Sequence, residues 1–402
     1  MAAAPAPEVT IFTSSFFLPT TFTATAVSKL LRIIRLAPAD DPVAAGGKGD
    51  GSSWEDAYRG NLAAAYADAA TYRGEVWIKT GAYDVAAPIH LKPRVRVIGG
   101  FAGDETSADA ADPVANPVIL TGDLNHDNYW RVNAAGSSVG EVVDYGNLVF
   151  NEPQPADRET YWAANGNNTD NAESCFIGDE PLSECVLEGL VVTCFKKTAV
   201  KTEATSPLKL VKCRFLANNT GINLGAANGA FVAKGTIDAE DCEFSMSHTP
   251  LTVQDAGASE TDPIRLTRCR FRLNYGATQD SGGGFSMDTP NRDLVLDGCE
   301  ITDNFGFEYQ LYQRCIVHIE NARSLTMCNT LVARNTYKNR AYSAFYIRKV
   351  SNGLFVDNCV FRDNQKIGHG NNTEAQNAAA FLLLFEYTSK RTRKIFLHGI
   401  LH

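Results

Sequence analysis

The stretch Leu208-Lys-Leu-Val-Lys-Cys-Arg-Phe-Leu-Ala-Asn218 decides the fold, because it recurs along the chain. It returns as Ile264 to Asn274, as Leu294 to Asn304 and as Leu354 to Asn364. Each copy has two alternating apolar residues, then a cysteine, a further apolar residue and an asparagine. Alternation of this kind indicates a short β-strand. Strands that repeat without a helical pattern between them are typical of a solenoid, in which stacked coils share one core.

The position of the cysteine recurs at steps of 29, 27, 30, 31 and 29 residues. It is filled by Cys213, Cys242, Cys269, Cys299, Thr330 and Cys359. The asparagine position is filled by Asn218, Asn274, Asn304, Asn335 and Asn364, with Ser247 in the second coil. Coils of strands stack about 4.8 Å apart. We therefore expect buried, unpaired thiols in one column and stacked amides at a turn in the other.

A second apolar marker also recurs. It reads Ala230-Phe-Val232, Gly284-Phe-Ser286, Ala344-Phe-Tyr346 and Ala380-Phe-Leu382, and each copy precedes a copy of the first motif. Each coil should thus hold at least two strands joined by turns. Weaker copies around Leu190 and from Ile395 to Ile400 extend the series in both directions. The sequence predicts an all-β, single-stranded right-handed parallel β-helix with a short N-terminal capping helix.

The residues before the regular coils divide into three parts. Residues 1–45 are interpreted as a leader, either signal-like or disordered. Residues 46–130 should form the cap and first coils, with Ser52 and Glu55 as a capping box before a helix that reaches Ala70. Residues 131–182 are polar and are predicted to form a surface excursion, and residues 183–402 the regular coils. The last coil stops before its turn asparagine, so we expect an incomplete solenoid that tends to self-associate.

Four stretches at the start of the solenoid resemble a known group. They are Gly49-Asp-Gly-Ser-Ser-Trp54, Glu75-Val-Trp-Ile-Lys-Thr-Gly81, Val97-Ile-Gly-Gly-Phe-Ala-Gly103 and Ile119-Leu-Thr-Gly-Asp-Leu-Asn125. They are similar to the opening of bacterial right-handed β-helix proteins of the pectin-lyase-like superfamily, in the branch of polymorphic outer-membrane and surface proteins. The resemblance implies the fold from Gly46 onward. Because the superfamily holds lyases, hydrolases and adhesins, it implies no single activity.

Charge and composition narrow the function. A net charge of −9 does not suit a general nucleic-acid binder, and residues 9–28 contain Pro19 and several hydroxyl residues, which makes them a poor membrane span. Alternate oxygen side chains at Asp123, Asn125 and Asp127 suit Ca²⁺, against the alternative of a solvated turn. Disulfides among Cys175, Cys185, Cys194 and Cys315 stay open.

No complete catalytic set can be assembled from the sequence. Asn168-Thr-Asp170 and Gly368-His-Gly370 resemble fragments of polygalacturonase motifs, but no Asp-Asp pair lies between them, since the chain's Asp40-Asp41 pair lies upstream. Charged residues occupy outward positions of the coils: Lys212, Asp238, Asp241, Arg268, Arg270, Arg272, Asp297, Asp303, Asp357 and Asp363. Aromatic side chains that could contact sugars are Tyr275, Tyr309, Tyr312, Tyr337 and Tyr342.

These observations favour a secreted or cell-surface β-helix module, structural or adhesive, whose partner is a polysaccharide or a cell-surface glycan. The alternative is a polysaccharide lyase or glycoside hydrolase that acts on an acidic, uronate-type polymer. A carboxylate pair beside an arginine or lysine on one face would favour the enzyme.

Overall fold

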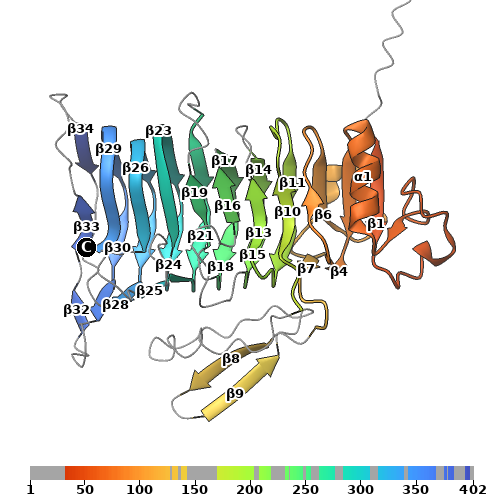
Figure 1. Ribbon diagram of the computed structural model, residues 1–402, viewed down its shortest axis with the longest axis horizontal. Coiled ribbons are helices and arrows are strands. Elements are labelled where there is room, and N and C mark those ends of the chain that lie inside the picture. Colours follow the sequence, from red (N-terminus) through yellow and green to blue (C-terminus); the bar gives the residue numbers. More distant parts are fainter. Residues whose placement is uncertain are drawn as a thin grey trace, which may run out of the picture. The chain divides into compact units, whose positions relative to one another are not determined.

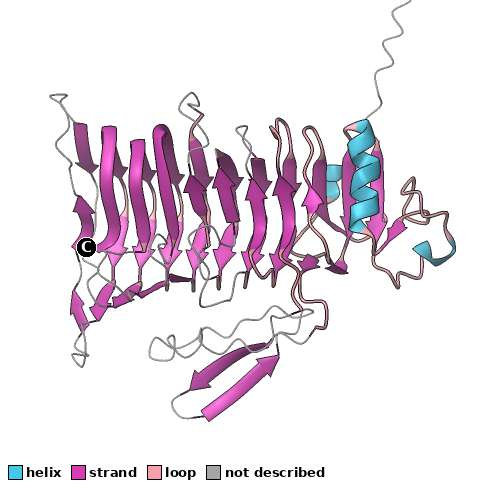
Figure 2. Cartoon of the chain, viewed as in Figure 1, coloured by secondary structure: helices cyan, strands magenta, loops and turns pink. Residues whose placement is uncertain are grey.

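The computed structural model describes residues 32–126, 129–134, 137–142, 170–202, 208–218, 231–234, 236–247, 250–254, 262–276, 284–307, 316–338, 343–367, 375–377, 379–383 and 394–398. Figures 1 and 2 show successive coils of parallel strands stacked side by side. Of the described pairings, only β8 (Tyr129–Ala134) with β9 (Ser137–Val142) and β31 (Gln365–Ile367) with β32 (Ala375–Asn377) run antiparallel. The chain therefore forms the predicted parallel β-helix.

Three parallel sheets run along the stack. Sheet A contains β1 (Ile33–Ala37), β2 (Tyr58–Arg59), β3 (Glu75–Lys79), β5 (Ile89–His90), β6 (Arg96–Phe101), β10 (Ser174–Gly178), β11 (Val186–Glu188), β13 (Thr198–Thr202), β14 (Leu208–Val211), β16 (Phe231–Lys234), β17 (Ile237–Glu240), β19 (Thr252–Gln254), β20 (Ile264–Thr267), β23 (Phe285–Asp297), β26 (Val317–Cys328), β29 (Ser343–Asp357), β33 (Ala379–Leu383) and β34 (Lys394–His398). Sheet B contains β4 (Gly81–Asp84), β7 (Val118–Thr121), β12 (Leu190–Thr193), β15 (Arg214–Leu216), β18 (Glu243–Ser245), β21 (Arg270–Arg272), β24 (Glu300–Thr302), β27 (Leu331–Ala333) and β30 (Val360–Arg362). The third sheet contains β22 (Tyr275–Gly276), β25 (Phe305–Phe307), β28 (Thr336–Lys338), β31 and β32.

Each regular coil turns twice through a residue in the left-handed backbone region. The first turn joins sheet A to sheet B, and its left-handed residue precedes the cysteine, as Arg268 (φ 50°) precedes Cys269. The second turn follows sheet B, and its left-handed residue precedes the asparagine, as Leu273 (φ 56°) precedes Asn274. Non-glycine residues in this region cost about 1–2 kcal/mol each. The contacts of the two ladder residues have to offset that cost.

The interior is a continuous apolar core that reaches from Ile34 to Phe361. The register places Phe215, Phe244 and Phe271 in one column, with ring centroids 5.2 and 4.9 Å apart. Burial of one such ring contributes about 1.5–3 kcal/mol. Phe285 and Phe345 of the second marker are also buried. The predicted stacking of like residues is confirmed.

The asparagine column is a chain of hydrogen bonds, as predicted. Asn304 donates from Nδ2 to the Phe271 carbonyl (2.8 Å) and to Asn335 Oδ1 (3.0 Å). Asn304 Oδ1 in turn accepts from the backbone N–H (3.1 Å) and Nδ2 (2.9 Å) of Asn274. Asn335 bonds to Asn364 in the same way. The buried polar groups at this turn thus form hydrogen bonds to neighbouring coils. Leaving such an amide buried without a partner would cost free energy.

The predicted N-terminal helix is present, but it begins later than the sequence predicts. Helix α1 (Leu62–Tyr72) begins after Asn61, whose Oδ1 accepts from the Ala64 N–H at 2.9 Å. Ser52 and Glu55 belong to turns, so the capping box is wrong. Neighbouring side chains hold local bonds instead: Asp50 accepts from the Ser52 N–H, and Ser53 from the Asp56 N–H. In the described part of the chain, no helix has the length and apolar character to cross a membrane.

Helix α1, which Figure 1 shows beside β1, contacts β1 and β3, and its residues Leu62, Ala65, Tyr66 and Ala69 are buried. Two short 3-10 helices, Ala44–Gly46 and Ala108–Ala110, lie in the surrounding loops. β1 pairs with β3 and begins at Ile33, inside the stretch interpreted as leader. The boundary at residue 45 is therefore too late, because Ile34 and Leu36 supply core side chains. Residues 1–31 lie outside the described residues.

The polar excursion also ends earlier than residue 182. β10 starts at Ser174 and pairs with β5 and β13 as part of sheet A. The backbone N–H of Asn125 donates to Asp170 Oδ2 at 3.1 Å, so the points where the chain leaves and rejoins the coils lie together. β8 and β9 belong to the excursion, and residues 143–169 lie outside the described residues.

Candidate functional site

The predicted calcium residues are partly described. Asp123 is fully buried, and its N–H donates to Thr121 Oγ1 at 3.1 Å. Asn125 is exposed, and Asp127 lies outside the described residues. Within those residues, no group of three or more histidine, cysteine, aspartate or glutamate side chains is arranged to hold a metal ion. The calcium site stays a prediction.

Few of the other sequence candidates lie among the described residues. Tyr275 lies in β22 and Tyr337 in β28, whereas Tyr309, Tyr312 and Tyr342 lie outside the described residues. The same holds for Asn168 and for Gly368 to Gly370. Cys175 and Cys185 are buried free thiols, and Cys194 is buried as well. Cys315 is not among the described residues.

The outward charges form ion pairs between coils. Arg268 contacts Glu240 (2.6 Å) and Asp241 (2.7 Å) of the preceding coil, and Arg334 contacts Asp303 (2.6 Å). Exposed pairs of this kind contribute about 0–1 kcal/mol each. These residues are explained by packing of a solvated face, and none of them needs a catalytic role.

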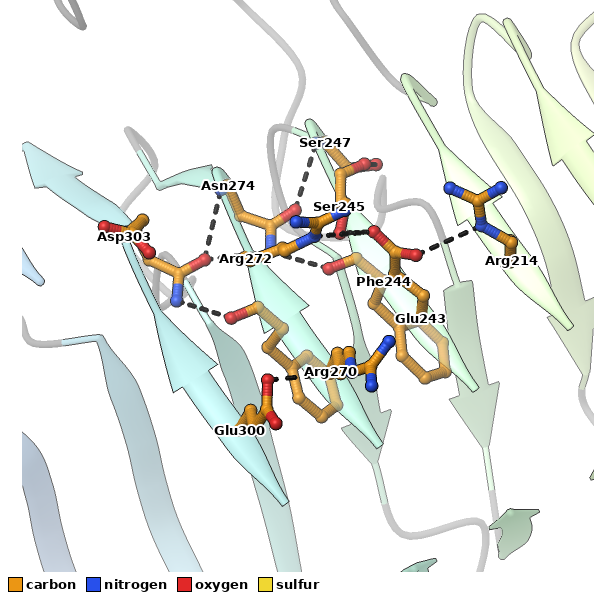
Figure 3. Close-up of polar contacts among 12 residues, drawn as sticks. Arg214, Glu243, Phe244, Ser245, Ser247, Arg270, Arg272, Asn274, Glu300 and Asp303 are labelled. Carbon is orange, nitrogen blue, oxygen red and sulfur yellow. Dashed lines mark hydrogen bonds and ion pairs between the residues drawn. The ribbon is translucent and has the colours of Figure 1, made fainter. Parts of the chain in front are cut away.

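One carboxylate on sheet B is different, because it is enclosed. Glu243 is 7% exposed and lies between Arg214 of the preceding coil (Nε to Oε2, 3.1 Å) and Arg272 of the following one (Nε to Oε1, 2.8 Å). The Ser245 hydroxyl donates to Oε1 at 2.8 Å. Figure 3 shows this group beside the more open Arg270–Glu300 pair. Burial acts to raise the pKa of Glu243, but the two arginines outweigh it and hold that pKa below its usual range.

The lowered pKa predicts how stability depends on pH. Ionised Glu243 stabilises the fold above its unfolded pKa of about 4.3, and this contribution is lost as pH falls through the lower folded pKa. We expect Glu243→Gln to reduce stability at neutral pH by about 1–3 kcal/mol. The deficit should shrink on acidification in urea unfolding measured across a pH series. Glu300→Gln, in the half-exposed pair, should change little. A deficit of constant size at every pH would contradict this account.

A second polar cluster lies on the outer face of sheet A. In the coils that form it, the two short sheet A strands of earlier coils are replaced by one long strand. β23, β26 and β29 run through 13, 12 and 15 residues without a break. The register between β23 and β26 shifts after Met287, so that Glu320 is an extra residue on β26. Bulges of this kind redirect side chains and are over-represented beside active sites.

Beside the bulge, the paired strands β26 and β29 carry four side chains of different chemistry on one face, which we call the bulge cluster: His318, Glu320, Tyr346 and Arg348. His318 Nε2 lies 3.4 Å from Glu320 Oε2, and Arg348 pairs with Glu320 Oε1. The rings of His318 and Tyr346 meet edge to face at 5.1 Å. The hydrogen bond from His318 and the pairing with Arg348 lower the pKa of Glu320, although its partial burial opposes them.

A further polar pair lies beside the bulge cluster. Asn321 donates from Nδ2 to Asp288 Oδ1 at 2.8 Å. One face of three adjacent coils thus presents two carboxylates, an imidazole, a guanidinium, an amide and an aromatic ring. Of the bulge cluster, only Tyr346 belongs to a pattern that stands out in the sequence, as part of a strand marker. The signal that could have found the others is the alternation that continues past Phe285 and Phe345, which places the intervening polar residues outward.

Comparison with known proteins supports the fold. Residues 198–380 match the family described as a right-handed beta helix region. Similar solved structures include the Dettilon tailspike protein gp208, with 9% identity over 87% of this chain and 68% of that chain and a TM-score of 0.31. Escherichia coli YbhC has 14% identity over 95% of this chain and 76% of that chain, with a TM-score of 0.23. Scores this low indicate no detailed correspondence. No curated protein matches the sequence.

Proposed function

Because this chain is a right-handed β-helix repeat protein, we propose that it is a glycan-contacting module that works outside the cell or on a cell surface. The observation that supports this proposal is the bulge cluster on β26 and β29, with Asp288 of β23 beside it. It combines fixed hydrogen-bonding groups with an aromatic ring on one outer face of adjacent coils.

The chemistry of the bulge cluster suits a sugar polymer. Glu320 is held from two sides by His318 and Arg348, so its geometry is set before a ligand arrives. Carboxylate, guanidinium and amide groups bond to hydroxyls and to sugar carboxylates, and the Tyr346 ring offers an apolar surface. The coils repeat about every 4.8 Å, so an extended polymer along the stack can meet several coils at once.

The proposal predicts which variants lose binding. We expect Arg348→Ala and His318→Ala to weaken retention on a responding polysaccharide by about tenfold or more, a change of about 1.4 kcal/mol. The polymer is first identified by a glycan array and then used in affinity electrophoresis. Arg334→Ala removes a matched ion pair on another face and is expected to bind as the wild type does. Equal loss in all three variants, or no response to any polymer on the array, would count against the proposal.

A second candidate function is cleavage of an acidic polysaccharide. Asp288 and Glu320 lie on adjacent strands, and two carboxylates on one face are what glycoside hydrolysis requires. The same polymers would be followed for reducing ends, which report hydrolysis, and for the ultraviolet absorbance of unsaturated uronates, which reports elimination. Activity that disappears in Glu320→Gln would favour the enzyme over the binding module.

We also propose weak Ca²⁺ binding by Asp123, Asn125 and Asp127, based on their alternate spacing in a polar loop. Millimolar Ca²⁺ should then raise the melting temperature by a few degrees, by the linkage of binding to folding. Asp127→Ala should remove that response. A melting temperature that does not change with Ca²⁺ would leave the loop a purely structural turn.

A further inference from the structure

The cysteine column holds four free thiols in consecutive coils. The register aligns Cys213 with Cys242, Cys242 with Cys269, and Cys269 with Cys299, because the residues on both sides of each cysteine are paired between coils. All four are at most 1% exposed and none is in a disulfide. The thiols of Cys213 and Cys269 both interact with that of Cys242, so the side chains as well as the backbones are neighbours.

The column is interrupted at one place. Thr330 occupies the next position, and its Oγ1 accepts from the Cys299 N–H at 3.3 Å. Cys359 follows Thr330 and therefore has a hydroxyl, not a thiol, as its neighbour on that side. Among the described residues, the column thus contains four thiols with thiol neighbours and a further buried thiol, Cys359, that Thr330 separates from them. This difference provides a control within the protein.

The spacing of the column matches a known coordination geometry. Adjacent strands in a sheet lie about 4.8 Å apart, so stacked cysteines in the same conformation have sulfur atoms at about that separation. A metal–thiolate bond is about 2.3 Å long, the value found for zinc, so a linear sulfur–metal–sulfur unit spans about 4.6 Å. Thiolates select soft cations such as Cu⁺. Linear coordination needs only two ligands, which one pair of neighbouring cysteines supplies.

We propose that neighbouring thiols of this column bind a soft d¹⁰ cation between two coils, in linear two-coordinate geometry. The pairs are Cys213 with Cys242 and Cys269 with Cys299. Four thiols in series form two separate pairs, so the site takes up to two ions. The ion class is that of Cu⁺, Ag⁺ and Hg²⁺.

The charge of the bound ion determines how many thiol protons are released. The column lies in an apolar core, where an unpaired charge is costly, so the bound unit should be neutral. A monovalent ion then replaces one thiol proton, leaving one thiolate and one thiol as ligands. A divalent ion replaces both, leaving two thiolates. The protons pass to solvent, and no electron is transferred.

Entry requires local opening, because the thiols are buried and already donate weakly to backbone carbonyls. Cys299 Sγ lies 3.1 Å from the Leu266 carbonyl, and Cys269 Sγ lies 3.4 Å from that of Ala239. Burial also raises the pKa of the Cys242 thiol, which slows loss of its proton. Uptake should therefore be slow and follow opening of the coils, and binding is to be measured at equilibrium.

The test is native mass spectrometry of the full chain with Ag⁺, which stays monovalent without a reductant, and with Hg²⁺. Six further cysteines add a background that is the same in every variant except Cys359→Thr, which lacks one of them. Threonine is the chosen replacement, since Thr330 shows that the position accepts it. Relative to Cys242→Thr/Cys299→Thr, which leaves no neighbouring thiols, the wild type should bind two more ions. Cys242→Thr should bind one more, and Cys359→Thr should match the wild type.

The second part of the test is a variant that should bind an additional ion. Thr330→Cys joins Cys299 to Cys359, makes six thiols in series and should raise the number of bound ions by one. Mass and pH measurements should show one proton released per Ag⁺ and two per Hg²⁺. Equal stoichiometry in the wild type and the double variant would overturn the proposal, as would loss of an ion in Cys359→Thr. If circular dichroism shows that the double variant is unfolded, failure of Thr330→Cys to gain an ion overturns it by itself.

Discussion

Replacing Cys269 by aspartate is expected to destabilise the protein by about 3–5 kcal/mol, the cost of a buried charge without a partner. Cys269 is fully buried, and the atoms nearest to its sulfur include the carbonyl oxygens of Ala239 (3.4 Å) and Thr267 (3.5 Å). A carboxylate there meets acceptors and other thiols, and no cation. The midpoint of urea unfolding should fall sharply or the variant should not fold.

The control is the adjacent residue. Arg270 points outward and its closest described partner is Glu300 at 3.6 Å, so Arg270→Ala should change stability by less than about 0.5 kcal/mol. The two positions differ by one residue in the chain and lie on opposite faces of the coil wall. Similar unfolding midpoints for Cys269→Asp and Arg270→Ala would show that the register is wrong.

The second large effect is expected at the asparagine column. Asn304→Ala removes four hydrogen bonds: two that its Nδ2 donates to Phe271 and Asn335, and two that its Oδ1 accepts from Asn274. The groups left behind are buried and cannot reach water, so we expect a loss of about 2–4 kcal/mol in the free energy of unfolding. Thermal and urea unfolding would both report it.

Two companion variants make this prediction specific. Asn304→Ser should lose less than Asn304→Ala, because Ser247 fills the same position in another coil and its hydroxyl accepts from the Asn218 N–H at 3.3 Å. Asn321→Ala removes an amide whose described bond, to Asp288, is exposed, and should change stability by about 0.5 kcal/mol or less. An alanine at position 304 as harmless as the one at 321 would mean that the ladder carries no stability.

The cysteine and asparagine columns could be predicted from the sequence because each position recurs in several copies of the same motif. Cys269 and Asn274 recur with the same flanking apolar residues, and stacking of like on like requires only that the coils be in register. β1 has no such copy: Ile33 to Ala37 follow the uncharged stretch 9–28 after a gap of four residues and carry no marker. β1 is recognised as a strand of the solenoid by its pairing with β3. The residue pattern of a single strand does not reveal its pairing partner.

The bulge beside this cluster could not be predicted for a similar reason. Glu320 and Asn321 are neighbours in the chain that both face outward, because β26 has one residue more than β23 at that point. Strict alternation predicts opposite faces for neighbours and gives no place for an extra residue. The geometry of the cluster is a property of two strands together, and His318 and Glu320 are ordinary strand residues when each is considered alone.

The two left-handed turns of each coil have a consequence for how such a chain changes in length. In all six regular coils the ladder cysteine, or its substitute Thr330, lies five residues before the residue of the asparagine column, whereas the whole coil varies between 27 and 31 residues. The arc across sheet B is thus fixed, since adding one residue there would move both columns out of line. Insertions, deletions and grafted peptides are confined to the arc that leads from the asparagine back to sheet A. That arc can diversify, in evolution or in engineering, while the other keeps every coil the same height.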